Sequence, residues 1–309
     1  MSVTTLQSGL VIAGHGRHVW VETNAGQRVL CHPRGKKNQT VVGDRVQWQA
    51  SKDEGTIEAV EPRRNLFYRQ DELRTKSFAA NLDQILILIA AEPEFSESQL
   101  VRALIAAEAQ HITPIIALNK RDLVLPFERA WQRLQAYSAM GYRLVPLALK
   151  PRSDLGGDDS HPLDTVLAGK TTLVLGPSGA GKSTLINRLI PDAQVLTNAI
   201  STALNSGKHT TTSTTWYWVD AHKTTAVIDS PGFQEFGLHH IDAMHLAGLM
   251  PDIAAVATAC KFYNCTHLHE PGCGVISAMK SDSNAHGISV KRYKIYSDLF
   301  AELSQQPRY

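Results

Sequence analysis

The chain contains 309 residues, of which 43% are hydrophobic and 19% are charged, proportions that exclude a disordered or fibrous protein. This length corresponds to two or three domains. The longest purely apolar run, residues 85–91, is far shorter than the roughly 20 residues that cross a bilayer, and residues 1–13 lack the basic and apolar parts of a signal peptide. We therefore expect a soluble cytoplasmic protein without membrane contacts.

The net charge of +2 is unevenly distributed along the chain. Residues 1–76 contain 12 Lys and Arg against 8 Asp and Glu, a local excess of +4, so the remainder of the chain carries −2. Such an excess is compatible with a surface that binds nucleic acid, and equally with an ordinary solvated face.

Residues 8 to about 70 are predicted to form a small β-barrel. The predicted strands are residues 18–22, 27–31, 43–48 and 55–60, and residues 24–26 (Asn-Ala-Gly) have the composition of a hairpin turn. Four or five short strands indicate an OB-fold, a small barrel that binds nucleic acids, although an SH3-like barrel would give the same pattern.

From residue 83 the pattern changes to alternating strands and helices. Residues 85–90 are continuously apolar, as expected of a strand buried on both faces of a parallel sheet. The other predicted strands are residues 114–118, 144–147, 172–175, 216–219 and 224–228, and the predicted helices are residues 98–110, 128–139 and one that begins at 182. This alternation indicates an α/β domain with a mostly parallel sheet. After residue 237 the chain is predicted to be helical.

Residues 176–183 (Gly-Pro-Ser-Gly-Ala-Gly-Lys-Ser) match the phosphate-loop pattern G-x-x-x-x-G-K-[ST], between a predicted strand and a predicted helix. In such a loop the backbone N–H groups converge on phosphate oxygens at a helix N-terminus. Lys182 is expected to contact the β- and γ-phosphates, and the Ser183 hydroxyl to hold Mg²⁺. The predicted phosphate-binding residues are Gly176, Pro177, Ser178, Gly179, Ala180, Gly181, Lys182, Ser183 and Thr184. The sequence therefore predicts binding of a nucleoside triphosphate.

A second motif predicts that the base is guanine. Asn119, Lys120, Arg121 and Asp122 match N-K-x-D and directly follow a predicted buried strand. The Asp122 carboxylate is expected to accept from guanine N1–H and from the exocyclic amine, a pair of donors that adenine lacks. Asn119 is expected to brace the loop and the Lys120 stem to lie along the base. The alternative is a polar turn that ends a strand.

Two further segments are candidates for the γ-phosphate and Mg²⁺. Asp229 and Gly232 match D-x-x-G after the apolar residues 225–228, so Asp229 is expected to hold Mg²⁺ through water and the Gly232 N–H to contact the γ-phosphate. Thr211, in the polar run 209–213, is the predicted third magnesium residue, which would be ordered when γ-phosphate is present. A Ser/Thr-rich surface loop is the alternative for this run.

The order of these motifs is reversed relative to ordinary GTPases. Asn119 lies 57 residues before Gly176, so the guanine motif precedes the phosphate loop. Because loops that follow neighbouring parallel strands meet at one edge of a sheet, a circularly permuted chain still assembles the site. The sequence therefore predicts a circularly permuted P-loop GTPase domain.

Four residues near the C-terminus have the spacing of a metal site. Cys260, Cys265, His267 and Cys273 supply three thiolates and one imidazole, a complete tetrahedral set for one structural Zn²⁺ with no position open for a catalytic water. A redox pair is the competing interpretation, but the cluster contains no C-x-x-C, and buried structural cysteines are a further alternative. His269 is a second candidate for the fourth ligand.

Taken together, these motifs in this order, between a small barrel and a Cys/His cluster, resemble the RsgA/YjeQ family of GTPases of small ribosomal subunit biogenesis. The resemblance covers nearly the whole chain and implies an OB-fold over 1–72, a permuted GTPase domain over 73–238 and a helical zinc domain over 239–309. It also implies that GTP hydrolysis is stimulated by the small ribosomal subunit, whose rRNA the family contacts near the decoding region late in maturation. We expect a monomer that binds GTP or GDP with Mg²⁺.

The sequence departs from the usual GTPase pattern at two places. Phe233 follows the D-x-x-G motif where many GTPases place the Gln that orients the attacking water, and the resemblance implies that His209 replaces it. The base-side loop that usually reads Ser-Ala here reads Leu-Ala-Leu-Lys at residues 147–150. Two other function classes stay open on sequence: an RNA-binding scaffold that uses nucleotide structurally, and a P-loop ATPase or kinase.

Overall fold

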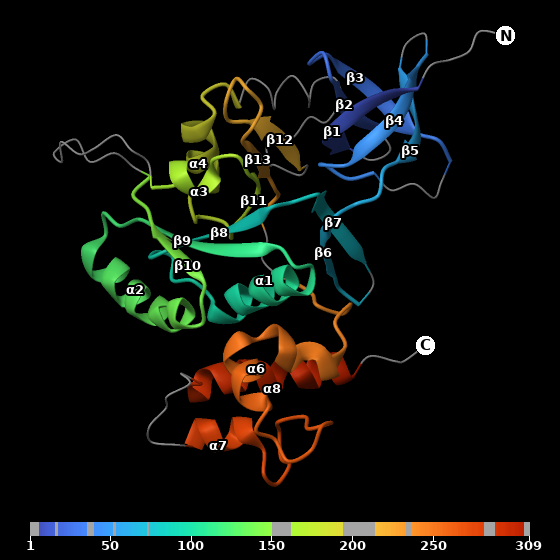
Figure 1. Cartoon of the computed structure of the whole chain (residues 1–309). Helices are drawn as coiled ribbons and strands as arrows, with labels where there is room; N and C mark the ends of the chain where they lie inside the picture. Colours follow the sequence, from blue (N-terminus) through green and yellow to red (C-terminus); the bar gives the residue numbers. More distant parts are fainter. Residues whose placement is uncertain are drawn as a thin grey trace.

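The computed structural model describes residues 6–15, 18–35, 40–51, 54–72, 74–149, 162–193, 214–232, 236–280 and 288–305. Along the chain it forms a β-barrel, then a sheet covered by helices, and then a helical unit, coloured from blue to red in Figure 1. The barrel and the helical unit lie at opposite ends of the molecule, with the sheet and its helices between them. In the described part of the chain, no helix is long and apolar enough to cross a membrane.

The N-terminal barrel is built from five strands. They are β1 (Gln7–His15), β2 (His18–Thr23), β3 (Arg28–Pro33), β4 (Arg45–Ala50) and β5 (Gly55–Val60). The neighbour order is β1-β2-β3-β5-β4, the β1–β4 pairing closes the barrel, and β3 and β5 run parallel. The prediction of an OB-like barrel is confirmed.

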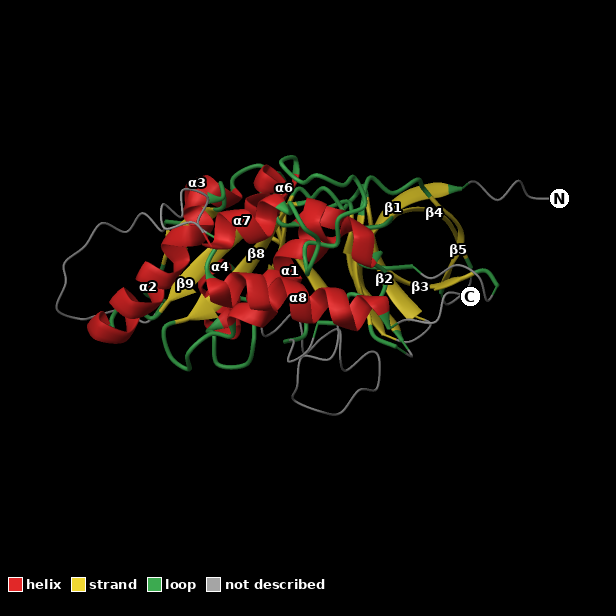
Figure 2. Ribbon diagram, turned by 90° about the horizontal axis from the view of Figure 1, so that it is seen from below, coloured by secondary structure: helices red, strands yellow, loops and turns green. Residues whose placement is uncertain are grey.

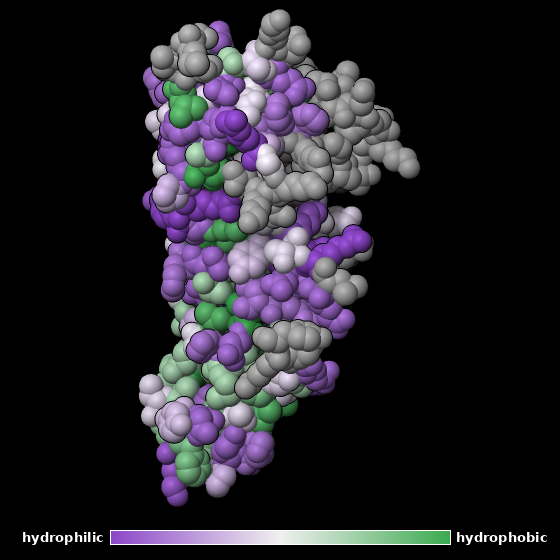
Figure 3. All heavy atoms as spheres, turned by 90° about the vertical axis from the view of Figure 1, so that its right-hand side faces the viewer, coloured by the Kyte–Doolittle hydropathy of each residue, from purple (hydrophilic) through white to green (hydrophobic). Residues whose placement is uncertain are grey.

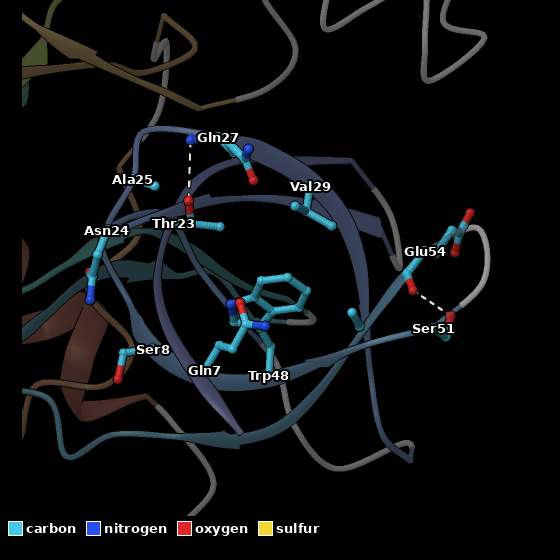
Figure 4. Close-up of a pocket in the computed structure, with 11 residues that line it drawn as sticks. Gln7, Ser8, Thr23, Asn24, Ala25, Gln27, Val29, Trp48, Ser51 and Glu54 are labelled. Carbon is cyan, nitrogen blue, oxygen red and sulfur yellow. Dashed lines mark hydrogen bonds between the residues drawn. The ribbon is translucent and has the colours of Figure 1, made fainter. Parts of the chain in front are cut away.

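Alternate side chains of the barrel strands fill its interior. Val21, Val46 and Ile57 are fully buried there, and Trp48 is 3% exposed. Figure 4 shows the Trp48 ring inside the circle of strands, and Trp48 lines a cavity of about 630 Å³ at one mouth of the barrel. The start of β1 and the β2–β3 and β4–β5 turns surround this mouth.

The central sheet has the order β10-β9-β8-β11-β13-β12 and is parallel except for β12. Its strands are β8 (Gln84–Ala90), β9 (Thr113–Asn119), β10 (Arg143–Pro146), β11 (Thr171–Leu175), β12 (Thr215–Trp218) and β13 (Ala226–Asp229). The predicted α/β domain with a mostly parallel sheet is therefore confirmed.

Helices cover both faces of this sheet (Figure 1). They are α1 (Glu97–Ala109) and α2 (Val124–Ala139) on one face, and α3 (Asp164–Leu167) and α4 (Lys182–Leu189) on the other. Every residue of β8 is buried because its side chains alternate between the two cores: Ile87 packs in the core that contains α1 and α2, and Leu88 in the core that contains α3 and α4. This is why the strand is continuously apolar.

The barrel is joined to the central sheet through one strand pairing and one buried carboxylate. Ala13 of β1 pairs with Thr215 of β12, so that strands of both units form one sheet. Glu22, 6% exposed, accepts hydrogen bonds from Trp218 Nε1 at 2.8 Å and from Lys223 Nζ at 2.6 Å. These contacts hold the barrel against the edge of the sheet.

A hairpin of β6 (Leu66–Gln70) and β7 (Thr75–Ala80) connects the barrel to the central sheet. Residue 72, the predicted end of the first domain, lies between these two strands.

The C-terminal unit contains η1 (Ala243–Leu249), α6 (Pro251–Ala257), α7 (Gly274–Lys280) and α8 (Val290–Ser304). Figure 2, seen from below, shows α8 in front of the sheet, and Arg102 of α1 forms an ion pair with Glu302 of α8. The prediction of a helical third unit is confirmed.

Candidate functional site

The guanine motif and the phosphate loop lie at the same edge of the sheet. The guanine motif begins with Asn119, the last residue of β9, and the phosphate loop follows Leu175, the last residue of β11. Both strands are parallel neighbours of β8, so their carboxyl ends point the same way. Asp229 ends β13, the next strand after β11. The sheet thus brings together motifs that the chain carries in reversed order.

The Asn119 side chain connects three loops at this edge. It is 4% exposed, and its Nδ2 donates to the carbonyl of Ala180 in the phosphate loop at 2.9 Å. Its Oδ1 accepts from the backbone N–H of Leu149 at 3.2 Å. The segment that contains Leu149 is therefore held beside the guanine motif even though its sequence departs from Ser-Ala.

Gly181 of the phosphate loop leaves the space that the Asn119 amide occupies. Its φ is +100°, and a Cβ added at this position would lie 2.4 Å from Asn119 Nδ2. Gly176, at the start of the loop, is also restricted, because a Cβ there would lie 2.7 Å from the carbonyl oxygen of Leu88. The two glycines therefore allow the loop to pass close to β8 and to the guanine motif.

The remaining side chains of the guanine motif differ in their contacts. Lys120 adopts a left-handed conformation with φ 68°, and its amine hydrogen-bonds to the carbonyl of Glu92 in the turn after β8. The backbone N–H of Arg121 donates to the carbonyl of Leu147 at 2.9 Å, and its side chain is exposed. The half-buried Asp122 carboxylate has no hydrogen-bond partner among the described residues, so it is free to accept from a ligand.

On the phosphate side, Lys182 and Asp229 form a buried ion pair. Lys182 Nζ lies 2.5 Å from Asp229 Oδ1, and both residues are less than a tenth exposed. Burial raises the pKa of Asp229, and the Lys182 ammonium partly opposes this shift. Ser183, beside Lys182, is exposed at the start of α4. The arrangement places an ammonium group, a hydroxyl and a carboxylate at the end of β11 and β13, the set of groups that a magnesium-bound phosphate chain requires.

One buried hydroxyl at this site was missed by the sequence analysis. Ser230 is fully buried and donates to the carbonyl of Val174 at 2.8 Å, which fixes the segment after β13 against β11. It occupies a variable position of D-x-x-G, so the motif gives no signal for it.

Gly232 is the last described residue of this segment. Four other residues discussed from the sequence lie outside the described residues: His209, Thr211, Phe233 and Lys150.

The Cys/His cluster forms a compact cage in the C-terminal unit. The ligand atoms of Cys260, Cys265, His267 and Cys273 all lie within 4.8 Å of one another. A tetrahedral zinc site places two sulfurs about 3.8 Å apart and a sulfur and a nitrogen about 3.6 Å apart. Here the Sγ atoms of Cys260 and Cys273 are 3.9 Å apart, and His267 Nδ1 lies 3.4 and 3.6 Å from them. The cage therefore has the dimensions of a tetrahedral metal site.

Neighbouring groups support this cage. Burial is the main cause that raises the pKa of Cys265 to about 12, so a thiolate at this position needs a cation close to it. Glu270, which the sequence analysis did not single out, accepts from the backbone N–H groups of Thr266, Leu268 and His269. His269 is exposed and does not belong to the cluster, so His267 is the fourth member.

Comparisons with known proteins agree with this geometry. The model of the RsgA GTPase family matches residues 60–239. This chain belongs to that family. It is 70% identical, over 98% of its own length and 95% of the relative's, to the "Small ribosomal subunit biogenesis GTPase RsgA" of Variovorax paradoxus, and 48% identical, over 96% and 92%, to the protein of that name from Paraburkholderia phymatum.

Two solved structures have the same fold. The structure described as "YloQ, a circularly permuted GTPase" superposes with a TM-score of 0.70 at 26% identity, covering 99% of this chain and 98% of that one. YjeQ from Thermotoga maritima gives a TM-score of 0.70 at 27% identity, covering 98% and 100%. The chain is thus a GTPase with a circularly permuted nucleotide-binding domain, and the prediction made from motif order is confirmed.

Replacing Gly181 by Ala should weaken GDP binding at least about tenfold, because the new Cβ displaces the Asn119 amide and breaks hydrogen bonds of about 1 kcal/mol each. Isothermal titration calorimetry measures this loss. Gly141→Ala is the matched control, since Gly141 has φ +95° but a Cβ there meets nothing within 4 Å. Both variants carry the strain of a left-handed Ala. Equal GDP affinities for the two variants would contradict the role of this contact.

Proposed function

We propose that this chain binds the small ribosomal subunit in the cytoplasm and hydrolyses GTP late in the maturation of that subunit, faster when bound than when free. The observation that carries the proposal is the 70% identity, over 98% of the chain, to a protein named for small ribosomal subunit biogenesis. The convergence of the guanine motif and the phosphate loop through Asn119 supports it from the geometry.

The nucleotide is proposed to lie across the carboxyl edge of β9, β8 and β11. Asp122 would accept from guanine, with Asn119, Lys120 and Arg121 forming the rest of the base loop. The phosphates would be held by Gly176, Pro177, Ser178, Gly179, Ala180, Gly181, Lys182, Ser183 and Thr184, with Gly232 at the γ-phosphate. For GTP to bind, Lys182 must turn from Asp229 toward the phosphates, which compensate its charge.

Hydrolysis requires a water oxygen to bond the γ-phosphorus while the bond to the β–γ bridging oxygen breaks, giving GDP and inorganic phosphate. Mg²⁺, when bound, neutralises charge on the phosphates, and Ser183, Asp229 and Thr211 are the residues proposed to hold it. Phe233 cannot orient water by a hydrogen bond. His209 is therefore proposed to position the attacking water, because either imidazole nitrogen hydrogen-bonds to water.

The other units are proposed to serve binding and structure. The barrel, residues 1–72, is proposed to contact rRNA, supported by its OB-like topology and the +4 excess of residues 1–76. Residues 73–238 form the proposed GTPase domain, and 239–309 a domain stabilised by one Zn²⁺. The chain is proposed to act as a monomer.

Hydrolysis rates of GTP and ATP, measured with and without purified small subunits, test this function. We expect slow hydrolysis of GTP alone, faster hydrolysis with subunits, and no comparable hydrolysis of ATP. Binding of GTP without any turnover, with or without subunits, would instead indicate a scaffold that uses nucleotide structurally. Faster hydrolysis of ATP than of GTP would contradict the guanine assignment.

The base assignment predicts the effect of Asp122→Asn. The change replaces an acceptor by a donor opposite guanine and should lower GTP affinity by about 10²–10⁴-fold, since each hydrogen bond to a charged group contributes about 1.5–3 kcal/mol. Affinity for xanthosine triphosphate should rise, because its base presents an acceptor there. Fluorescent-nucleotide titrations measure both. Glu128→Gln, at an exposed position of α2, is the control, and unchanged GTP affinity of Asp122→Asn would disprove the assignment.

The water-positioning role predicts that His209→Ala lowers the subunit-stimulated rate by about 10²–10⁴-fold, the range for side chains that handle a proton in the transition state. GTP affinity should change little, because the group acts mainly in that state. Single-turnover hydrolysis with saturating small subunits measures the rate. His222→Ala, at an exposed turn, is the control. A wild-type rate for His209→Ala would mean that the subunit or another residue supplies the group.

Zinc is proposed because the cage offers three sulfurs and one nitrogen at tetrahedral distances. Cys265→Ala should abolish bound zinc and unfold the C-terminal unit, since small metal modules depend on the ion for folding. Elemental analysis and limited proteolysis are the measurements. His269→Ala and Cys31→Ala, the latter in the barrel core, should keep one zinc per chain. Freshly purified wild-type protein without zinc would contradict the proposal.

A further inference from the structure

A fully buried hydroxyl lies between the two D-x-x-G residues proposed to meet Mg²⁺ and the γ-phosphate. Ser230 is 0% exposed, and its Oγ donates to the carbonyl of Val174 in β11 at 2.8 Å. The carbonyl of Pro231 is farther away, at 3.4 Å, so the single hydroxyl proton is shared with Val174. Polar side chains mostly lie at the surface, as in the hydrophilic barrel end of the face in Figure 3, and a buried hydroxyl needs a partner. The Ser230 side chain is therefore held in one orientation.

This hydrogen bond lies where the ladder between β11 and β13 ends. The two strands pair in parallel, and Val174 with Asp229 is the final pair among the described residues. The Ser230 hydroxyl attaches the next residue of the chain to the same part of β11 through the Val174 carbonyl. The chain is therefore still tied to β11 one residue beyond the ladder.

The residues after Ser230 have little freedom and lie near the phosphate loop. Pro231 is buried, and its ring fixes its own φ and restricts the Ser230 backbone to extended conformations. A Cβ added at Gly232 would lie 3.5 Å from the carbonyl oxygen of Gly176, the first residue of the loop, whereas Gly232 itself is exposed. An anchor at Ser230 therefore sets where the Gly232 N–H lies relative to the phosphate loop.

The residue before Ser230 needs no such anchor. Asp229 pairs with Val174 of β11 on one side and with Thr215 of β12 on the other, so the sheet already fixes its backbone. Beyond Asp229 the chain leaves both strands. The hydroxyl of Ser230 therefore acts mainly on the segment that leads to Gly232.

We propose that Ser230 is a positioning residue that fixes the Gly232 N–H where the γ-phosphate arrives. The inference rests on the proposed function, in which Gly232 contacts the γ-phosphate. GDP has no γ-phosphate, so the hydroxyl matters for the binding and hydrolysis of GTP and not for the binding of GDP. A hydroxyl that only supported the fold would affect both nucleotides alike.

Ser230→Ala removes the hydroxyl and tests this role in the full-length chain. We expect the affinity for a non-hydrolysable GTP analogue to fall about 5- to 30-fold, the effect of one or two hydrogen bonds, while GDP affinity changes less than about twofold. Single-turnover hydrolysis of GTP by the protein alone should slow by about 10- to 100-fold, since small displacements of positioned groups have effects of this size. Ser230→Thr keeps the hydroxyl and should keep the wild-type ratio of GTP to GDP affinity.

Thr172→Val is the matched control. Thr172 is also fully buried, lies at the end of β11 away from the phosphate loop, and its hydroxyl accepts from Gln84 Nε2 at 2.9 Å. Losing this hydroxyl should lower the melting temperature without changing the ratio of GTP to GDP affinity. Gly232→Ala tests the underlying contact and should slow hydrolysis at least as much as Ser230→Ala, because the added methyl group lies beside the N–H. Melting temperatures verify that each variant is folded during the assays.

The outcomes separate the inference from the proposed function. If Gly232→Ala slows hydrolysis and Ser230→Ala does not, the γ-phosphate contact stands and the role of Ser230 is overturned. If neither variant changes hydrolysis, the contact proposed for Gly232 is wrong and the inference fails with it. Equal losses of GTP and GDP affinity in Ser230→Ala, or a GTP-selective loss in Thr172→Val, would reduce Ser230 to a structural role. A folded Ser230→Thr protein that behaves as Ser230→Ala does would rule out the hydroxyl as the cause.

Discussion

The nucleotide site depends on one buried amide. Asn119 ends β9, donates to Ala180 in the phosphate loop and accepts from the backbone of Leu149, so its two polar atoms hold three segments together. Each such hydrogen bond contributes about 1 kcal/mol, and a buried group left without its partner would cost about 1–3 kcal/mol more. The position of Asp122, three residues further on, is therefore fixed relative to the phosphate loop.

The order of strands in the sheet explains why a circularly permuted chain still assembles the nucleotide site. In the sheet β8 alone separates β9 from β11, so the guanine motif and the phosphate loop meet whichever comes first in the sequence. Because of the permutation, the chain that follows Asp229 continues toward the C-terminal unit. The chain after Gly232 reaches Phe236, whose ring packs 5.6 Å from that of Phe67, and Gly237, whose carbonyl accepts from the N–H of Gln70. The chain beyond Gly232 thus continues into contacts with β6 and then into the C-terminal unit.

Much of the site could be predicted from the sequence because motifs are made of side-chain types at fixed spacing. The sequence indicated Asn119 and Lys182, and the structure brings their segments to one edge of the sheet. The backbone partners could not be predicted, since every residue has an N–H and a carbonyl; the amide of Leu149 and the carbonyl of Glu92 are examples. Ser230 was missed for the same reason, because its partner is the carbonyl of a residue 56 positions away.

The fold shows the same division between local and long-range information. The buried strand β8 and the five-stranded barrel have clear local patterns, and both were predicted. Helix α2 begins at Val124, four residues before the predicted start at 128. This earlier start could not be predicted, because Leu123 makes no side-chain cap and no capping residue marks the position. The join between the barrel and the sheet, through Glu22 and Lys223, links residues about 200 positions apart and has no local signature.

The GDP affinity of Asn119→Ala, measured beside its thermal stability, tests whether the Asn119 amide holds the guanine motif and the phosphate loop together. We expect the variant to stay folded, to keep its zinc, and to lose GDP affinity by about 10- to 100-fold, the effect of two hydrogen bonds. Wild-type affinity for GDP in a folded Asn119→Ala protein would contradict it.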